Sequence, residues 1–324
     1  MKKFILYLLS IYLFIPISVF AYSDYIMASG QNIGIELKSD YVLVVGSYKI
    51  KNYNVLTDTN LKIGDKITKI NDIRVTSVKN MQNVINELNE ENIEVTYTRG
   101  HNEYKEEITL YKENNEYKTG LYVRDMIRGV ATLTYIDVDN NNSFGALGHE
   151  ILEKSTKSKF ESKDGTIFSS TVTSITKSND GNPGEKNARS DSSLVYGNVL
   201  ENTESGIFGT YTSSLPKNKL YKVATPDEIK QGNAKILTVI KDNKVEEFDI
   251  SIIRINENSN TKNILFEVTD KTLLEKTGGI VQGMSGSPII QGDNIIGAVN
   301  FVLVDSPEKG YGIFITNMLE EAEN

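Results

Sequence analysis

The sequence contains no cysteine, and this absence removes three kinds of chemistry at once. A thiol nucleophile, a thiolate zinc site and a disulfide all require cysteine side chains. The absence does not place the chain inside the cell, because exported proteins can fold without disulfides. Any nucleophile must therefore come from another residue type.

Positive charge is also scarce. The chain carries 35 Lys and Arg against 43 Asp and Glu, which gives a formal net charge of −8. Nucleic-acid-binding proteins usually present a basic patch or stripe, so the composition argues against that class. The 39% hydrophobic and 24% charged residues are ordinary for a soluble globular protein, and 324 residues suffice for two domains.

The N-terminus has the order of a secretory signal. "MKKFILYLLSIYLFIPISVFAYS" places two lysines before an apolar run from Phe4 to Phe20, followed by Ala21. This order favours a signal peptide over residues 1–21, cleaved after Ala21. An uncleaved membrane anchor is the alternative, because the run just reaches spanning length. Either interpretation places the remainder outside the cytoplasm.

Residues 30–112 are predicted to form one small α+β domain. "LKIGDKITKINDIRV" gives a turn at Gly64-Asp65 and then an alternating strand from Ile67 to Val75. "SVKNMQNVINELNEEN" carries apolar residues at helical spacing behind a candidate N-cap, Ser77. "IEVTYTRG" and "EYKEEITLY" are expected to pair as a hairpin through Gly100.

The Gly-Asp turn, "INDIRV", the helix and "IEVTYTR" together resemble the PDZ family. This resemblance implies that backbone amides of a loop grip the C-terminal carboxylate of a peptide, which adds a strand to the sheet. The peptide-binding loop would be Ile33, Gly34 and Ile35, by the same resemblance. A generic α+β packing domain is the alternative interpretation.

The polar segment 113–120 is expected to be a linker, and residues 121–324 are expected to form an all-β domain. Alternating strands are broken by turn-forming tips at 139–142 and 241–244. The segment 161–206 suggests short strands joined by long loops. No internal repeat or long helix stands out in this half, so a sandwich or barrel is the economical prediction. The whole chain is therefore expected to be mainly β.

A serine between glycines is the most distinctive motif. "GGIVQGMSGSPII" places Ser285 on a tight turn between two strand-like runs. Glycines let the backbone approach a substrate closely. The motif offers Ser285 as nucleophile and the N–H groups of Gly283 and Ser285 as donors to an oxyanion. Ser287 is a rival nucleophile, but Pro288 next to it favours Ser285.

A serine hydroxyl needs a base to become a nucleophile, and histidine is the side chain best suited to this at neutral pH. The chain has two histidines, His101 and His149. His101 lies at the predicted hairpin tip and is expected to be solvated. His149 lies in "FGALGHEI", between strands, where it is either a structural group or the general base for Ser285.

"GMSGSPIIQGDNIIGAV" resembles the segment around the nucleophile of chymotrypsin-like serine peptidases. Together with "GLYVRD", "ATLTYIDVDNNNSFGALGHEI" and "FEVTDKTLLEKTGGIVQGMSGSP", it is most similar to the stage IV sporulation protein B family. This resemblance implies a signal or anchor, a PDZ domain and then a chymotrypsin-like serine endopeptidase. It also implies self-cleavage and cleavage of a membrane-associated partner between the forespore membranes, which signals activation of a late sigma factor.

The third catalytic residue implied by the family resemblance is Asp270 in "FEVTDKT". It would orient His149, or else shape the pocket or cap the turn at Lys271-Thr272. Other acids lie in the same half of the chain: Asp137, Asp139 and Asp191.

No metal or cofactor is expected. "HEILE" lacks the second histidine of a helical zinc motif, and "GNPGEKN" lacks the Lys-Ser/Thr ending of a phosphate-binding loop. Two alternatives to a signalling peptidase stay open. One is a secreted PDZ scaffold with an inactive peptidase half, and the other is an extracytoplasmic quality-control protease.

Overall fold

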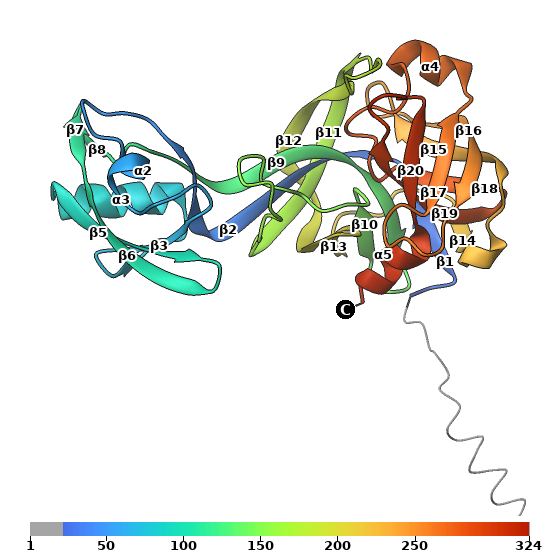
Figure 1. The fold of residues 1–324 in the computed structure, drawn as a ribbon. Helices are drawn as coiled ribbons and strands as arrows, with labels where there is room; N and C mark the ends of the chain where they lie inside the picture. Colours follow the sequence, from blue (N-terminus) through green and yellow to red (C-terminus); the bar gives the residue numbers. More distant parts are fainter. Residues whose placement is uncertain (1–21, 324) are drawn as a thin grey trace, which may run out of the picture.

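The computed structural model describes residues 22–323, so the predicted signal segment, residues 1–21, lies outside the described residues. Figure 1 shows two lobes joined by two long paired strands, β2 (Asn32–Ser47) and β9 (Leu121–Asp137). We call residues 41–123 the small lobe and the remaining described residues the large lobe. The architecture is mainly β, as predicted.

The first half of the large lobe is a closed antiparallel barrel. Its ring of paired strands runs β2–β9–β10–β13–β12–β11 and returns to β2. The additional strands are β10 (Ser143–Ala146), β11 (Asp164–Thr176), β12 (Glu185–Thr203) and β13 (Gly206–Tyr211). Alternate residues such as Ile33, Ile35 and Leu37 point into one buried cluster, because successive side chains of a strand face opposite sides.

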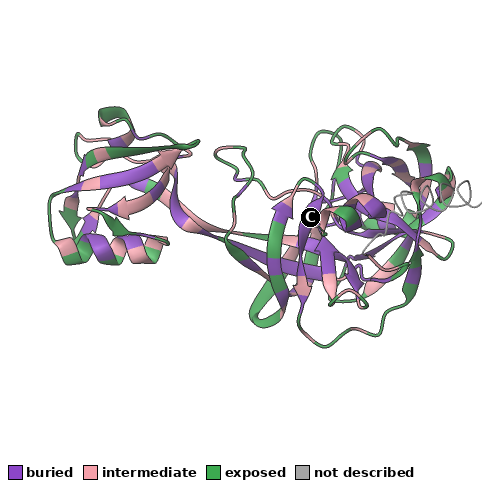
Figure 2. Ribbon diagram, turned by 90° about the horizontal axis from the view of Figure 1, so that it is seen from below, coloured by how far each residue is buried: buried purple, intermediate pink, exposed green. Residues whose placement is uncertain are grey.

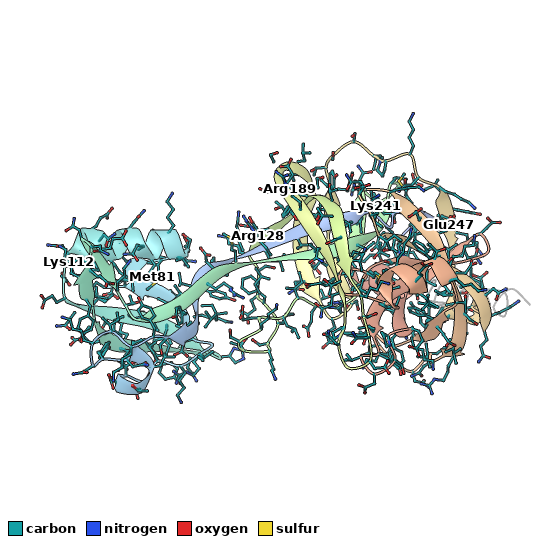
Figure 3. All side chains as sticks on the ribbon, turned by 90° about the horizontal axis from the view of Figure 1, so that it is seen from above. Met81, Lys112, Arg128, Arg189, Lys241 and Glu247 are labelled. Carbon is teal, nitrogen blue, oxygen red and sulfur yellow. The ribbon has the colours of Figure 1, made fainter. Side chains whose placement is uncertain are left out.

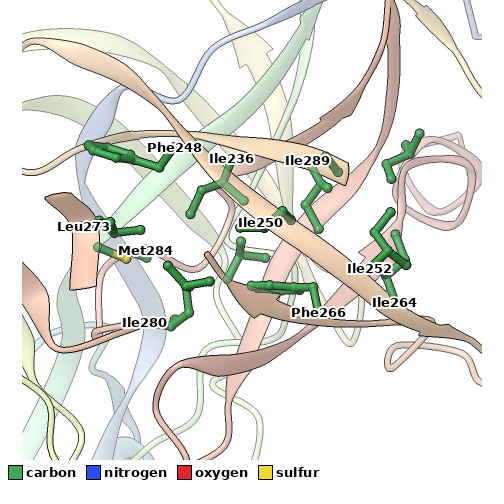
Figure 4. Close-up of a cluster of buried hydrophobic side chains, with 14 of the residues drawn as sticks. Ile236, Phe248, Ile250, Ile252, Ile264, Phe266, Leu273, Ile280, Met284 and Ile289 are labelled. Atoms are coloured by element: carbon green, nitrogen blue, oxygen red, sulfur yellow. The ribbon is translucent and has the colours of Figure 1, made fainter. Parts of the chain in front are cut away.

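The second half is another closed antiparallel barrel. Its ring runs β15–β16–β17–β20–β19–β18 and returns to β15. These strands are β15 (Gly232–Val239), β16 (Val245–Ile255), β17 (Ile264–Val268), β18 (Pro288–Gln291), β19 (Asn294–Val302) and β20 (Lys309–Phe314). Figure 4 shows its interior, filled by isoleucines together with Phe248, Phe266 and Met284. Two closed barrels in one chain agree with a chymotrypsin-like domain.

Short elements complete the large lobe. β1 (Tyr25–Ala28) pairs with β9 and β14 (Leu220–Val223), and β14 pairs with β19, so these strands bridge the two barrels. The helices are η1 (Pro226–Glu228), α4 (Lys271–Thr277) and α5 (Ile315–Glu321). None of the helices between residues 22 and 323 combines the length and the apolar composition that crossing a membrane requires.

The small lobe is inserted between β2 and β9. Its elements are α2 (Val55–Asp58), β3 (Lys66–Ile70), β4 (Ile73–Arg74), α3 (Val78–Leu88), β5 (Asn92–Arg99), β6 (Asn102–Thr109), β7 (Tyr111–Glu113) and β8 (Glu116–Lys118). The predicted helix is confirmed: Ser77 caps α3, and Met81, Val84 and Ile85 are buried. Figure 2 shows the outer face of this helix exposed. The predicted hairpin through Gly100 is also confirmed.

The strand expected from Ile67 to Val75 is instead a hairpin. Asn71 and Asp72 have positive φ values of 44° and 62°, and they turn the chain between β3 and β4. Two consecutive residues with positive φ are typical of a tight hairpin turn. The segment 161–206 differs too, because the expected short strands are the two long strands β11 and β12.

The boundaries of the lobes differ from the expected domains. Residues 32–38 pair with β9 and β11 of the large lobe, although a domain starting at residue 30 was expected. The expected linker 113–120 contains most of the β7–β8 hairpin, and Tyr117 from it is buried in the small lobe. The buried Tyr117 ring and the hydrogen bond from its hydroxyl to Asn89 favour this packing over an open linker.

Candidate active site

Ser285 lies on a tight loop between α4 and β18. Its neighbour Met284 is fully buried in the second barrel and anchors the loop there. Gly286, at φ +92°, packs so closely that an added Cβ would lie 2.1 Å from the Thr132 carbonyl oxygen. The Ser285 hydroxyl donates to the Asn300 carbonyl at 3.0 Å. Position 286 therefore requires glycine, because strand β9 crosses directly behind Ser285.

Two amides of this loop are oriented together. The carbonyl of Gln282, in the same peptide unit as the Gly283 N–H, accepts a hydrogen bond from β12 at 2.8 Å. The carbonyl of Met284, in the same unit as the Ser285 N–H, accepts from Ser287 at 2.9 Å. Because a trans peptide directs N–H and C=O in opposite directions, both N–H orientations are fixed. Neither N–H has an acceptor within residues 22–323, so both can donate to an oxyanion.

His149 follows β10, after two residues with positive φ, Leu147 and Gly148. Its Nδ1 lies 2.8 Å from the carbonyl oxygen of Glu150. A carbonyl can only accept, so Nδ1 carries the hydrogen and Nε2 is left as a bare base. Burial lowers the pKa of His149 below its ordinary value, which keeps the imidazole neutral.

The end of β19 brings the histidine and serine segments together. Ser285 bonds to the carbonyl of Asn300, and the next residue, Phe301, stacks on the His149 ring with centroids 5.4 Å apart. Within the described residues the serine hydroxyl bonds to Asn300 and not to the imidazole. The side chains of Ser285 and His149 therefore contact adjacent residues of β19, and no hydrogen bond joins the two side chains in this state.

Thr132 of β9 connects the same two segments from the other side. Its N–H donates to the Ser285 carbonyl at 3.0 Å, and its carbonyl accepts from Leu147 at 3.3 Å. Its hydroxyl donates to the Gly283 carbonyl at 2.8 Å. Thr134, two residues along the same face, donates to the Gly286 carbonyl at 2.8 Å. Strand β9 thus holds the segment before His149 and the Ser285 loop in fixed positions relative to each other.

Asp270 lies at the N-terminus of α4. Its carboxylate accepts from the Leu273 N–H at 2.9 Å, and Leu274 donates to its carbonyl at 3.0 Å. These are the bonds of a helix N-cap, one of the alternative roles stated for this residue. No hydrogen bond joins Asp270 to His149 within residues 22–323. The orienting contact of the imidazole is the Glu150 carbonyl.

The predicted peptide-binding loop is wrong in its placement. Ile33, Gly34 and Ile35 lie inside β2, paired on one side with β9 and on the other with β11. Ile33 and Ile35 are buried in the first barrel. A central strand of a barrel has no free edge, so it cannot accept a peptide as an added strand.

The other candidates have separate surroundings. Ser287 is fully buried, and its hydroxyl has no partner among the described residues, so a substrate cannot reach it. Asp137 is buried and accepts from the Ser23 hydroxyl at 2.6 Å. Asp191 accepts from Ser193, and His101 is exposed at the tip of the β5–β6 hairpin. Residues 22–323 hold no group of three His, Cys, Asp or Glu side chains placed to bind a metal.

Sequence reasoning missed three residues of the site: Thr132, Thr134 and Lys186. The threonines alternate in "ATLTYID", and an alternating polar face in an apolar strand is the one signal that marks them. Lys186 lies in a polar segment and carries no signal in the sequence.

The comparisons with known proteins agree with this geometry. A family model described as SpoIVB peptidase S55 matches residues 115–319, more than half of the chain. No curated protein matches. The matched region includes His149 and Ser285 and excludes most of the small lobe.

Proposed function

The chain belongs to the SpoIVB peptidase S55 family, and we propose that Ser285 and His149 carry out its serine endopeptidase reaction. The observation that carries this assignment is that Ser285 and His149 contact adjacent residues of β19. Ser285 bonds to the Asn300 carbonyl, and His149 stacks on Phe301. The family also assigns the enzyme to sporulation.

In the proposed reaction the Ser285 hydroxyl turns from the Asn300 carbonyl toward Nε2 of His149. The imidazole takes the proton as the serine oxygen attacks the carbonyl carbon of the scissile peptide bond. The Gly283 and Ser285 N–H groups donate to the oxygen of the tetrahedral intermediate. His149 then gives the proton to the leaving amine, and water hydrolyses the acyl-enzyme by the reverse roles.

The biological target is a finer proposal. By its family, the enzyme would cleave itself and a membrane-associated partner between the forespore membranes, and so signal activation of a late sigma factor. The signal segment would export it, and the small lobe would tether partners as a PDZ-like domain.

Labelling of the purified full chain with a fluorophosphonate probe tests the assignment. We expect the wild type to be labelled, Ser285→Ala to be unlabelled, and His149→Ala to label at least a hundredfold more slowly. Shortening of the wild type on expression, with Ser285→Ala remaining full length, would support self-cleavage. Folded wild-type protein that resists the probe would instead support the inactive scaffold.

A further inference from the structure

A buried lysine packs against the loop that presents the N–H groups of Gly283 and Ser285. Lys186, at the start of β12, is only 5% exposed. Its Nζ lies 3.2 Å from the Thr132 hydroxyl on β9 and 3.0 Å from the Thr238 hydroxyl on β15. No carboxylate lies within ion-pair distance of Lys186 anywhere in residues 22–323. A buried ammonium without a counter-ion destabilises a fold, so packing alone does not explain this residue.

Lys186 contacts the loop in three ways. Its backbone N–H donates to the Gln282 carbonyl at 2.8 Å. Its aliphatic stem packs under Gly283, where an added Cβ would lie 3.1 Å from the lysine Cδ. Its Nζ reaches the Gly283 carbonyl through the hydroxyl of Thr132.

The direction of the two hydrogen bonds that connect Lys186, Thr132 and Gly283 follows from the number of hydrogens on the threonine hydroxyl. A threonine hydroxyl has one hydrogen, and Thr132 donates it to the Gly283 carbonyl. The Thr132 oxygen must then accept from Lys186, and hydrogen bonds in such a chain strengthen one another. Gly283, at φ +94°, has no side chain of its own to resist rotation of its peptide units.

We propose that Lys186 is a positioning residue that locks the peptide units around Gly283, through Thr132, in the orientation that presents the oxyanion amides. This inference rests on the proposed role of Ser285. Lys186 does not touch the reacting atoms. It acts by preventing rotation of the Gly283–Met284 peptide, which lies between the two peptide units whose N–H groups donate to the oxyanion.

The buried charge of Lys186 lowers the stability of the fold, so a functional role for this residue can be separated by experiment from a structural one. Burial lowers its pKa to about 7, and among residues 22–323 its ammonium has hydrogen-bond partners only in Thr132 and Thr238 of the neighbouring strands. The unfolded chain binds this proton up to about pH 10.4. The native state is therefore penalised most below pH 7, and the penalty disappears as the pH rises toward 10. Replacing the lysine with an apolar residue should stabilise the protein and slow the enzyme.

The test measures fluorophosphonate labelling and melting temperature for the full chain and three variants. We expect Lys186→Met and Thr132→Val to lower the labelling rate constant by about 10- to 100-fold, with little change in the probe's affinity. Lys186→Met should melt higher than the wild type, more so at pH 6 than at pH 10. Thr238→Val is the matched control, because it removes a hydroxyl from Lys186 but leaves the Thr132 bond to Gly283.

The fold-decrease in the labelling rate constant should be at least fivefold smaller for Thr238→Val than for Thr132→Val. Wild-type labelling rates in Lys186→Met, or an equal loss in the two threonine variants, would overturn the proposal. A lower melting temperature of Lys186→Met that accounts for its loss of rate would also overturn it, as a purely structural effect. Failure of the wild type to label would overturn the Ser285 assignment itself, and the proposal with it.

Discussion

His149 receives its orientation from a backbone carbonyl, which cannot be titrated. With the hydrogen on Nδ1 and the pKa lowered by burial, the imidazole is a neutral base at pH 7. Protonation of Nε2 removes the acceptor for the serine proton, so activity is lost as the pH falls below the ordinary histidine pKa of about 6.5. Because burial lowers the pKa of His149, we expect kcat/KM on a peptide substrate to fall about tenfold per pH unit only once the pH is below this ordinary value.

A pH–rate profile of the full chain measures this directly. An acid limb centred above pH 7 would contradict a histidine desolvated by burial. Lys186→Met serves as the control profile, since it removes the other buried group that titrates near neutrality.

Gly286 has almost no room behind it. A methyl group there would approach the Thr132 carbonyl oxygen to 2.1 Å, and β9 cannot retreat without releasing Leu147 as well. We expect Gly286→Ala to reduce fluorophosphonate labelling of Ser285 by more than about 100-fold, comparable with loss of an oxyanion donor. Gly292→Ala is the matched control, because Gly292 also has positive φ, +63°, but open space around it. That control should retain its labelling rate, and an equal loss in both would point to backbone strain.

At the scale of elements, α4 determines where the serine loop begins. Asp270 caps this helix, and the C-cap at Gly278 leads directly into the motif. Asp270→Ala should lower the free energy of unfolding by about 1 kcal/mol, whereas Asp270→Asn, an equally good cap, should not. Chemical denaturation of the two variants measures the difference.

The activities of the same variants decide between the two roles of Asp270. If Asp270→Asn keeps its stability but loses labelling, the carboxylate orients the site as the sequence predicted. If both stability and labelling are kept, the cap is its function.

Sequence reasoning predicted elements where local chemistry decides the structure. The α3 helix, the Gly100 hairpin and the Ser285 turn follow from caps, spacing and glycine, which act within a few residues. It failed where pairing over long distances decides. Ile33 to Ile35 form a central strand because β9 and β11, far along the chain, enclose them. Lys186 acquires its role only when three strands converge, so no local pattern predicts it, whereas Thr132 is marked only by the alternating polar face of its strand.

At the scale of the whole molecule, the loop that leaves His149 reaches the small lobe. Arg124 of β9 pairs with the buried carboxylate of Glu153 at 2.6 Å. Further along the loop, Glu161 pairs with Lys66, and its carbonyl accepts from the Tyr41 hydroxyl. The loop thus begins at His149 and is held at its other end by the inserted lobe.

The two ion pairs should differ in importance. The Glu153 side chain is 1% exposed and also accepts from the Ser155 N–H, whereas the Glu161 side chain is 62% exposed. Glu153→Gln should cost roughly 2 kcal/mol of stability and slow labelling of Ser285 by displacing Glu150 and His149. Glu161→Gln should change stability by less than about 1 kcal/mol. Equal effects in thermal melts and labelling would contradict a specific role for the buried pair.

The small lobe is carried by two paired strands, β2 and β9, whose pairing is interrupted between Lys38 and Leu43. Figure 3 labels Arg128 of β9, which pairs with Glu36 of β2. The inner end of this pair of strands is Thr132, which bonds to the carbonyl beside the nucleophile. The strand β9 therefore runs from the small lobe to the residue that bonds to the Ser285 backbone. We expect a partner that binds the small lobe to act on the backbone of Ser285 through β9, without contacting the serine itself.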